Sequence, residues 1–172
     1  IMSFEELTDW FLQNPDLGGL FMFLLGFLES FVLTGLIWPS ALLLFVAIAL
    51  NQADLNLLVI CSGAVLGSFS GDLISFFLGY YYGPKIKESR ILKKREYIFK
   101  KGQKFFEKYG IGAIFIGRFL PAIRPVVPIV AGLIQMSKQR FIITCILACI
   151  SWSIALAILV VGMDNIISLF YF

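Results

Sequence analysis

Histidine is missing from this 172-residue sequence, which removes the side chain that most often serves as a general base or a metal ligand. Cysteine is scarce as well. Its three copies, Cys61, Cys145 and Cys149, lie in apolar runs without Cys-x-x-Cys spacing, a pattern that favours packing over redox or metal roles. We therefore expect neither a metal nor a cofactor. The lack of a nucleophile–base pair argues against a membrane enzyme such as a lipid phosphatase.

Charged residues make up only 15% of the chain, whereas 59% of the residues are hydrophobic. A soluble domain of this length cannot bury so much apolar surface, because roughly half of its residues must face water. The composition predicts an all-α integral membrane protein with one domain and only a few crossings. No basic region precedes an apolar core near residue 1, so we expect no cleavable signal peptide.

Two apolar segments, residues 57–82 and 141–163, have the length and composition of membrane-spanning helices. Small residues recur at every fourth position of the first segment, a pattern that favours the close approach of another helix. These residues are Gly63, Gly67, Gly71, Ser75, Gly79 and Gly83. We interpret this stripe as a packing surface.

Two other segments are amphipathic. Residues 1–19 are acidic, with Trp10 as a candidate anchor at the membrane interface, and residues 84–109 are rich in lysine and arginine. Nucleic-acid binding is the rival interpretation of any basic run. However, the apolar face of residues 84–109 needs a membrane or protein surface, so we expect a helix on the bilayer and no nucleic-acid partner.

The remaining apolar segments, residues 20–50 and 110–137, are interrupted. The first is too long for one crossing and too short for two. We interpret both as re-entrant hairpins, because broken helices survive at membrane depth only when they are buried in protein or line a cavity. The prolines that break them are Pro39 in the first and Pro121, Pro125 and Pro128 in the second.

The placement of basic residues supports re-entry of the second hairpin. If residues 110–137 return to the side from which they enter, then Lys138 and Arg140 share a face with the basic helix. All lysines and arginines outside the hairpins are then cytoplasmic, as the positive-inside rule requires. The chain becomes an inverted repeat of a hairpin followed by a span, which is a common plan of transporters.

Four charged residues fall inside the predicted membrane region: Glu29, Asp72, Arg118 and Arg124. A charge at the bilayer centre costs about 2.5–3.5 kcal/mol on insertion scales, so these side chains must pair, reach water or bind a ligand. Their formal charges sum to zero, and a purely structural cluster of ion pairs is one interpretation.

The other interpretation assigns roles to these four side chains. Arg118 and Arg124 offer planar forks that suit a phosphate, and backbone N–H groups at a half-helix start could add anion contacts. Glu29 and Asp72 could carry protons, because carboxylates in partly dry sites exchange them near neutral pH. Ser68 and Ser75 lie at helical spacing from Asp72 and predict a hydrogen-bonded, more structural acid, so we expect Glu29 to matter more.

The segment Gly117–Arg124, continuing through Pro125, Pro128 and Gly132, resembles the signature of the DedA family of membrane proteins, which carry a SNARE-associated or VTT-type domain. Phe27-Leu28-Glu29 and Gly71-Asp72 are similar to two weaker family motifs. The resemblance extends from about Gly26 to Gly162.

One position departs from the family pattern. The family commonly carries Pro-Gly followed by an acid in its first hairpin, where this chain has Pro39-Ser40-Ala41. Proton coupling would then depend on Glu29 and Asp72.

The resemblance implies facing re-entrant hairpins and lipid movement linked to the proton motive force. Family members are implicated in flipping undecaprenyl phosphate and phosphatidylethanolamine. We therefore expect a multi-pass protein of the bacterial inner membrane that flips a lipid phosphate, with undecaprenyl phosphate as the first choice. The alternatives are a glycerophospholipid flippase or scramblase and a structural or assembly protein, and a homo-oligomer stays open.

Overall fold

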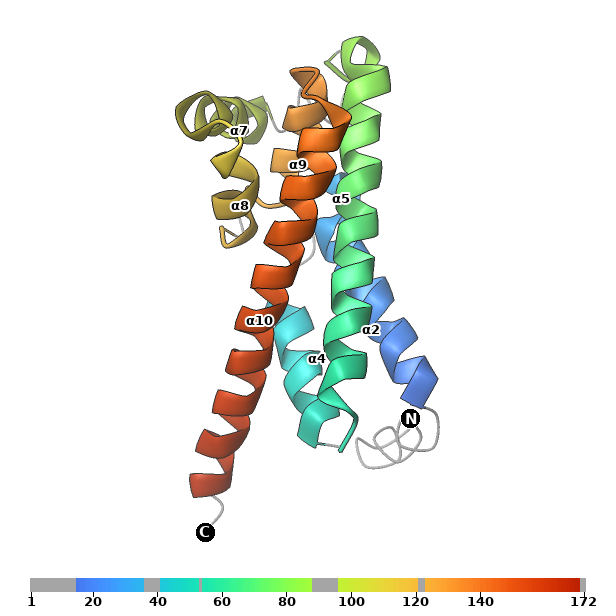
Figure 1. Cartoon of the computed structure of the whole chain (residues 1–172), viewed down its shortest axis with the longest axis vertical. Coiled ribbons are helices and arrows are strands. Elements are labelled where there is room, and N and C mark those ends of the chain that lie inside the picture. The colour runs from blue at the N-terminus through green and yellow to red at the C-terminus, as the bar shows by residue number, and fades with distance from the viewer. Residues whose placement is uncertain (1–14, 36–40, 53, 88–95, 121–122, 171–172) are drawn as a thin grey trace.

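In the residues that the computed structural model describes, all regular secondary structure is α-helical, and short turns join the helices (Figure 1). These residues are 15–35, 41–52, 54–87, 96–120 and 123–170. The predicted all-α class is therefore confirmed for the described part of the chain. Most of the predicted N-terminal amphipathic segment, together with Pro39 and Pro121, lies outside these residues.

Two long helices form the frame of the molecule: α5, Leu57–Lys87, and α10, Lys138–Phe170. With 31 and 33 residues, they extend about 46 and 50 Å at 1.5 Å per residue, more than the ~30 Å hydrocarbon core of a bilayer. Their apolar parts, Leu57–Gly83 and Lys138–Met163, are long and apolar enough to cross a membrane. The two predicted spans fall within these parts.

The first interrupted segment forms α2, Pro15–Ser30, the single turn α3, Val32–Gly35, and α4, Ala41–Gln52. In Figure 1, α2 rises from the lower end of the molecule and α4 returns to that end, where α5 begins. Neither α2 nor α4 is as long as the hydrocarbon core is thick, because 16 and 12 residues span only about 24 and 18 Å.

The second interrupted segment mirrors this arrangement at the upper end of the molecule (Figure 1). Helix α7, Glu96–Tyr109, lies across this end, α8, Gly112–Arg118, descends from it, and α9, Val126–Leu133, rises back. The basic helix expected over residues 84–109 is thus divided in the described residues, because residues 84–87 continue α5.

Glycines of α5 allow both short-helix segments to pack closely on this helix, as the stripe predicts. A Cβ added at Gly67 would lie 1.9 Å from the carbonyl oxygen of Phe23 in α2. One added at Gly79 would lie 2.2 Å from the carbonyl oxygen of Ile129 in α9. Only glycine permits such backbone contacts. Helix α5 is therefore the common support of α2 and α9.

The outer face of α10 is apolar and uncovered by the described residues. Large aliphatic side chains recur along it: Ile143, Leu147, Ile150, Ile154 and Ile158. Its inner face is buried, and Phe141 stacks on Phe76 of α5 with ring centroids 4.1 Å apart. An exposed aliphatic stripe of this length, on a helix long enough to cross a bilayer, indicates contact with lipid.

Candidate functional site

The four predicted intramembrane charges meet in one buried cluster. Glu29 lies one residue before the end of α2, Asp72 lies in α5, Arg118 is the last residue of α8, and Arg124 lies in the turn before α9. Their exposed fractions are 3%, 2%, 5% and 4%, respectively. Charges this deeply buried must be paired or hydrogen-bonded to be tolerated.

Each arginine forms an ion pair with one acid. The Nη1 of Arg118 donates to the Oδ2 of Asp72, and the Nη1 of Arg124 donates to the Oε1 of Glu29. The first pair joins α8 to α5, and the second joins the turn before α9 to the end of α2. The two short-helix segments are therefore connected through charge, and the formal charges of the cluster cancel.

Arg124 has additional partners. Its Nη2 donates to the hydroxyl oxygens of Ser30 and Ser68, each at 3.2 Å. Both serines are completely buried. Ser30 follows Glu29 directly in the chain, so one turn of α2 supplies two acceptors to the same guanidinium group. These contacts fix the orientation of the Arg124 fork.

The expected hydrogen bonds from serines to Asp72 are absent from the described residues. Ser75 instead donates to the carbonyl oxygen of Gly71 at 2.8 Å and accepts the backbone N–H of Val32 at 3.0 Å. Asp72 accepts from the thiol of Cys145, with 3.5 Å between sulfur and Oδ2. Helical spacing alone did not reveal that backbone groups compete for the serine hydroxyls.

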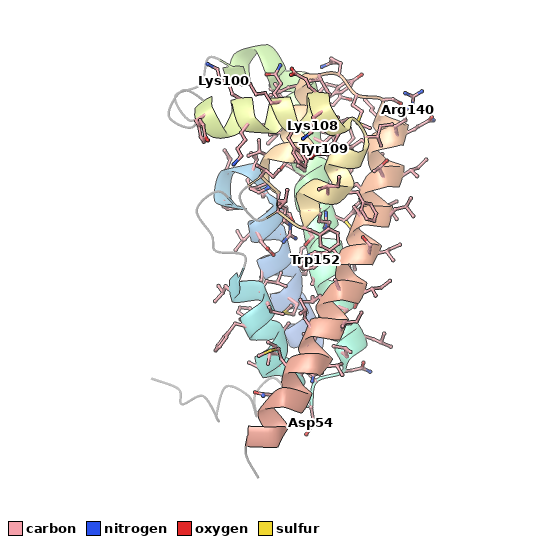
Figure 2. All side chains as sticks on the ribbon, turned by 90° about the vertical axis from the view of Figure 1, so that its left-hand side faces the viewer. Asp54, Lys100, Lys108, Tyr109, Arg140 and Trp152 are labelled. Atoms are coloured by element: carbon pink, nitrogen blue, oxygen red, sulfur yellow. The ribbon has the colours of Figure 1, made fainter. Side chains whose placement is uncertain are left out.

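Trp152 of α10 faces both arginines and was not anticipated from the sequence. Its ring centroid lies 4.6 Å from the Cζ of Arg124 and 5.9 Å from the Cζ of Arg118, within the range of cation–π contacts. Figure 2 places it near the middle of α10. Membrane tryptophans usually lie near the interfaces. The position of this tryptophan in the middle of a predicted span was therefore the sequence feature that could have indicated a role for it.

Several polar atoms of the cluster are buried without a hydrogen-bond partner among the described residues. They are the Nε and Nη2 of Arg118, the Nε of Arg124, the Oε2 of Glu29 and the Oδ1 of Asp72. A buried donor without an acceptor costs about 1–3 kcal/mol, and more when it is charged. The cluster therefore retains three guanidinium donors that a further acceptor could satisfy.

The turn before α9 is held by hydrogen bonds within its own backbone. The N–H groups of Val126 and Val127 donate to the carbonyl oxygen of Ile123, at 3.0 and 3.1 Å. These two N–H groups of the half-helix start are therefore not available to an anion. Pro125 caps α9, and Pro128 lies in its first turn, where a missing N–H breaks no helical bond.

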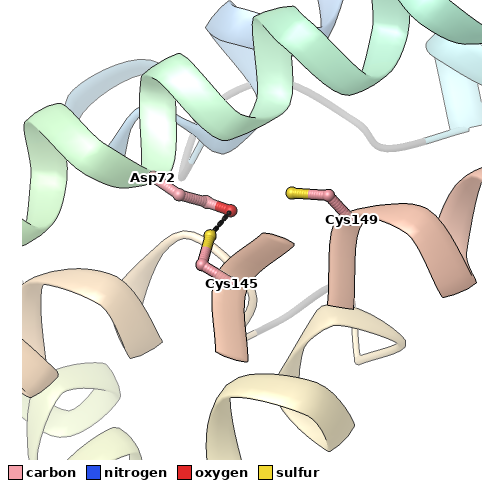
Figure 3. Close-up of side chains that lie close together, drawn as sticks. All are labelled: Asp72, Cys145 and Cys149. Carbon is pink, nitrogen blue, oxygen red and sulfur yellow. Dashed lines mark hydrogen bonds between the residues drawn. The ribbon is translucent and has the colours of Figure 1, made fainter. Parts of the chain in front are cut away.

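Asp72, Cys145 and Cys149 bring three potential ligand atoms within 4.8 Å of one another (Figure 3). All three residues are buried. A soft cation would find two sulfurs and one carboxylate there. However, the Arg118 guanidinium already neutralises that carboxylate, so a metal would have to displace a paired cation. Cys145 donates to Asp72, and both cysteines are packed in the hydrophobic core.

Residues 38–162 match the VTT domain family. The chain is 32% identical to protein DedA of Escherichia coli strain K12 over 144 residues, which cover 78% of this chain and 65% of that protein. It is 31% identical to the inner membrane protein YabI of the same organism over 130 residues, covering 75% of this chain and 51% of YabI.

A third relative is named undecaprenyl phosphate transporter A, from Bacillus subtilis strain 168. It is 30% identical over 92 residues, which cover 52% of this chain and 46% of that protein. The chain thus spans about half to two thirds of the length of the curated relatives that it matches. No solved structure matches the chain.

Proposed function

Since this chain belongs to the VTT domain family of membrane proteins, which includes DedA, we propose that it transports a lipid phosphate across a bacterial inner membrane. The observation that carries the proposal is the buried arginine pair with three unsatisfied donors. Guanidinium groups bind phosphate oxygens through parallel hydrogen bonds. A phosphate held between Arg118 and Arg124 could satisfy these donors while it lies inside the membrane region.

The arrangement of short helices supports a substrate path at this depth. We propose that α2–α4 and α8–α9 are re-entrant hairpins that enter from opposite faces. With 12 to 16 residues in the arms of the first and 7 to 8 in those of the second, no arm reaches across ~30 Å of hydrocarbon. The charged cluster lies where the ends of α2, α8 and α9 approach one another around α5, as in transporters built from broken helices.

The acids would control release of the substrate. In the structure, Asp72 and Glu29 each occupy one position on an arginine fork, Asp72 on Arg118 and Glu29 on Arg124. A bound phosphate would compete with them, and protonation of either acid would free its arginine for the lipid. Transport could therefore respond to a proton gradient, and Glu29 and Asp72 would carry this coupling.

The lipid proposed first is undecaprenyl phosphate, because one relative bears the name of a transporter of that lipid. The test is transport in proteoliposomes that contain the purified chain, with undecaprenyl phosphate in one set and phosphatidylethanolamine in another, with and without a pH gradient. We expect movement of undecaprenyl phosphate that exceeds protein-free vesicles. Movement of phosphatidylethanolamine alone would replace this lipid with a glycerophospholipid, and movement of neither would refute the proposal.

A structural role is the second candidate. It is favoured by the two ion pairs, in which each arginine already has an acidic partner. Buried ion pairs can be replaced by apolar residues without loss of stability when both partners are exchanged together. A variant with Glu29, Asp72, Arg118 and Arg124 all replaced by apolar residues separates the candidates. Full activity of this variant in cells would support the structural role, whereas a folded but inactive variant supports transport.

A further inference from the structure

A second cationic feature lies outside the buried cluster, on the helix that crosses the upper end of the molecule. A cavity of about 390 Å³ opens between α7 and the segment that joins α8 to α9. Three lysines of α7 line it, namely Lys101, Lys104 and Lys108, and its apolar wall includes Phe105, Leu120 and Ile123. We call this cavity the α7 groove.

The lysines of the groove share one side of α7. Lys104 follows Lys101 by three residues and precedes Lys108 by four, the spacing that places side chains along one helical face. All three are exposed. Lys108 also lies over the ring of Tyr109, with its Nζ 5.1 Å from the centroid, and Tyr109 lines the groove as well. The groove therefore combines concentrated positive charge with an apolar wall.

The groove adjoins the chain segment that carries the two buried arginines. Leu120 lies two residues after Arg118, and Ile123 directly precedes Arg124. The carbonyl oxygen of Leu120 accepts the backbone N–H of Arg124 at 3.0 Å. The apolar wall of the groove is thus part of the turn that positions the arginine forks.

We propose that the α7 groove binds the phosphate headgroup of an anionic lipid from the adjacent membrane leaflet. The lysine ammonium groups would contact the phosphate oxygens, and Phe105, Leu120 and Ile123 would contact the first methylenes of the lipid. A cavity of this size suits a headgroup with the start of its chains. The groove would deliver a lipid phosphate to Arg118 and Arg124, a role that rests on the proposed transport function.

Position and charge favour a lipid over other anionic partners. Figure 2 shows Lys100, Lys108 and Arg140 at the same end of the molecule, with Asp54 at the opposite end. Helix α7 lies across this basic end, where the headgroups of a bilayer crossed by α5 and α10 would lie. A headgroup with attached chains fits both the cationic and the apolar lining.

The test places a fluorescent reporter in the groove of the full chain. Tyr109→Trp is introduced after Phe has replaced the native tryptophans, Trp10, Trp38 and Trp152. The protein is reconstituted in phosphatidylcholine nanodiscs. One set contains phosphatidic acid with brominated chains, and the other contains phosphatidylcholine with brominated chains at the same mole fraction. Bromine quenches tryptophan only at short range. We expect stronger quenching by brominated phosphatidic acid, whose phosphate monoester represents the proposed headgroup.

Matched double variants show whether the groove lysines cause this preference. Lys101→Gln with Lys104→Gln removes two groove charges, whereas Lys100→Gln with Arg140→Gln removes two charges at the same end of the molecule but outside the groove. We expect the first variant to lose the preference for phosphatidic acid and the control to keep it. Circular dichroism checks that both remain folded.

Three results would overturn the proposal: equal quenching by the two lipids in the reporter protein, a preference that survives Lys101→Gln with Lys104→Gln, or an equal loss in the control variant. The last result would show general attraction to a charged surface. Because this assay involves no transport, its outcome is separate from the proteoliposome test. A groove that binds the lipid in an inactive transporter would refute the proposed function and leave the groove site intact.

Discussion

Breaking the Arg124–Glu29 pair should destabilise the protein strongly, whereas removing both charges together should cost much less than the sum. Arg124→Gln leaves the Glu29 carboxylate in a site where only 3% of the residue is exposed. It also removes the donor to Ser30 and Ser68. An uncompensated buried charge costs about 3–5 kcal/mol. Glu29→Gln should cost a similar amount, because the Arg124 guanidinium then remains without a counter-charge.

The double variant Arg124→Gln with Glu29→Gln contains two neutral amides that can hydrogen-bond to each other. We therefore expect a coupling free energy of about 2–3 kcal/mol in the double-mutant cycle, at the upper end for contacting residues. The free energy of unfolding can be measured by titrating SDS into detergent micelles that contain each variant. The cycle tests the pairing in the structure directly.

A second cycle provides the control. Arg118 pairs with Asp72 rather than with Glu29, so Arg118→Gln and Glu29→Gln should show a clearly smaller coupling free energy. Coupling below about 0.5 kcal/mol between Arg124 and Glu29, the level of independent sites, would refute the pairing. Equal coupling in both cycles would show that the four charges interact as a diffuse cluster without specific partners.

Three further predictions concern packing, the aromatic contact and topology. Gly67→Ala should lower the melting temperature in detergent, because the new Cβ would lie 1.9 Å from a carbonyl oxygen of α2. Overpacking of this kind lowers the free energy of unfolding by about 1–3 kcal/mol. In the control Gly162→Ala, the new Cβ meets no atom within 4 Å, so the melting temperature should not change. Trp152→Leu should weaken lipid-phosphate binding, measured in an equilibrium binding assay, by about 1–2 kcal/mol, the range of partly desolvated cation–π contacts. Unchanged affinity would exclude a role for the ring. In intact cells, a membrane-impermeant maleimide should label Asp54→Cys but not Arg140→Cys, and the reverse pattern would invert the proposed topology.

Membrane energetics made much of this fold predictable from the sequence. Residues 57–82 and 141–163 were predictable as long apolar helices, because a membrane crossing requires such a helix. It was also predictable that the four buried charged side chains would lie close together, because an isolated charge at that depth has a high free-energy cost. Glycine spacing correctly indicated the packing surface of α5, because close backbone contact is the main advantage of small residues in such helices.

Details that depend on tertiary structure could not be derived in this way. The sequence does not specify which acid pairs with Arg118 and which with Arg124, because this depends on how the ends of α2 and α8 approach α5. Hydrogen bonding of Ser68 to Arg124 also depends on contacts between distant segments. The expectation that serines would bond to Asp72 failed because spacing along one helix takes no account of competing acceptors.

In the proposed mechanism, Arg118 and Arg124 bind the phosphate of the transported lipid. The most direct measurement is transport of undecaprenyl phosphate by Arg118→Lys and Arg124→Lys in proteoliposomes, with Arg140→Lys as the exposed control, at equal reconstituted amounts of folded protein. Lysine keeps the positive charge but cannot form the planar fork. We expect both buried substitutions to lower the transport rate at least roughly tenfold, or about 1.4 kcal/mol, and the control to leave it unchanged. Near-normal transport by both buried variants would show that the arginines only balance charge and do not grip the phosphate.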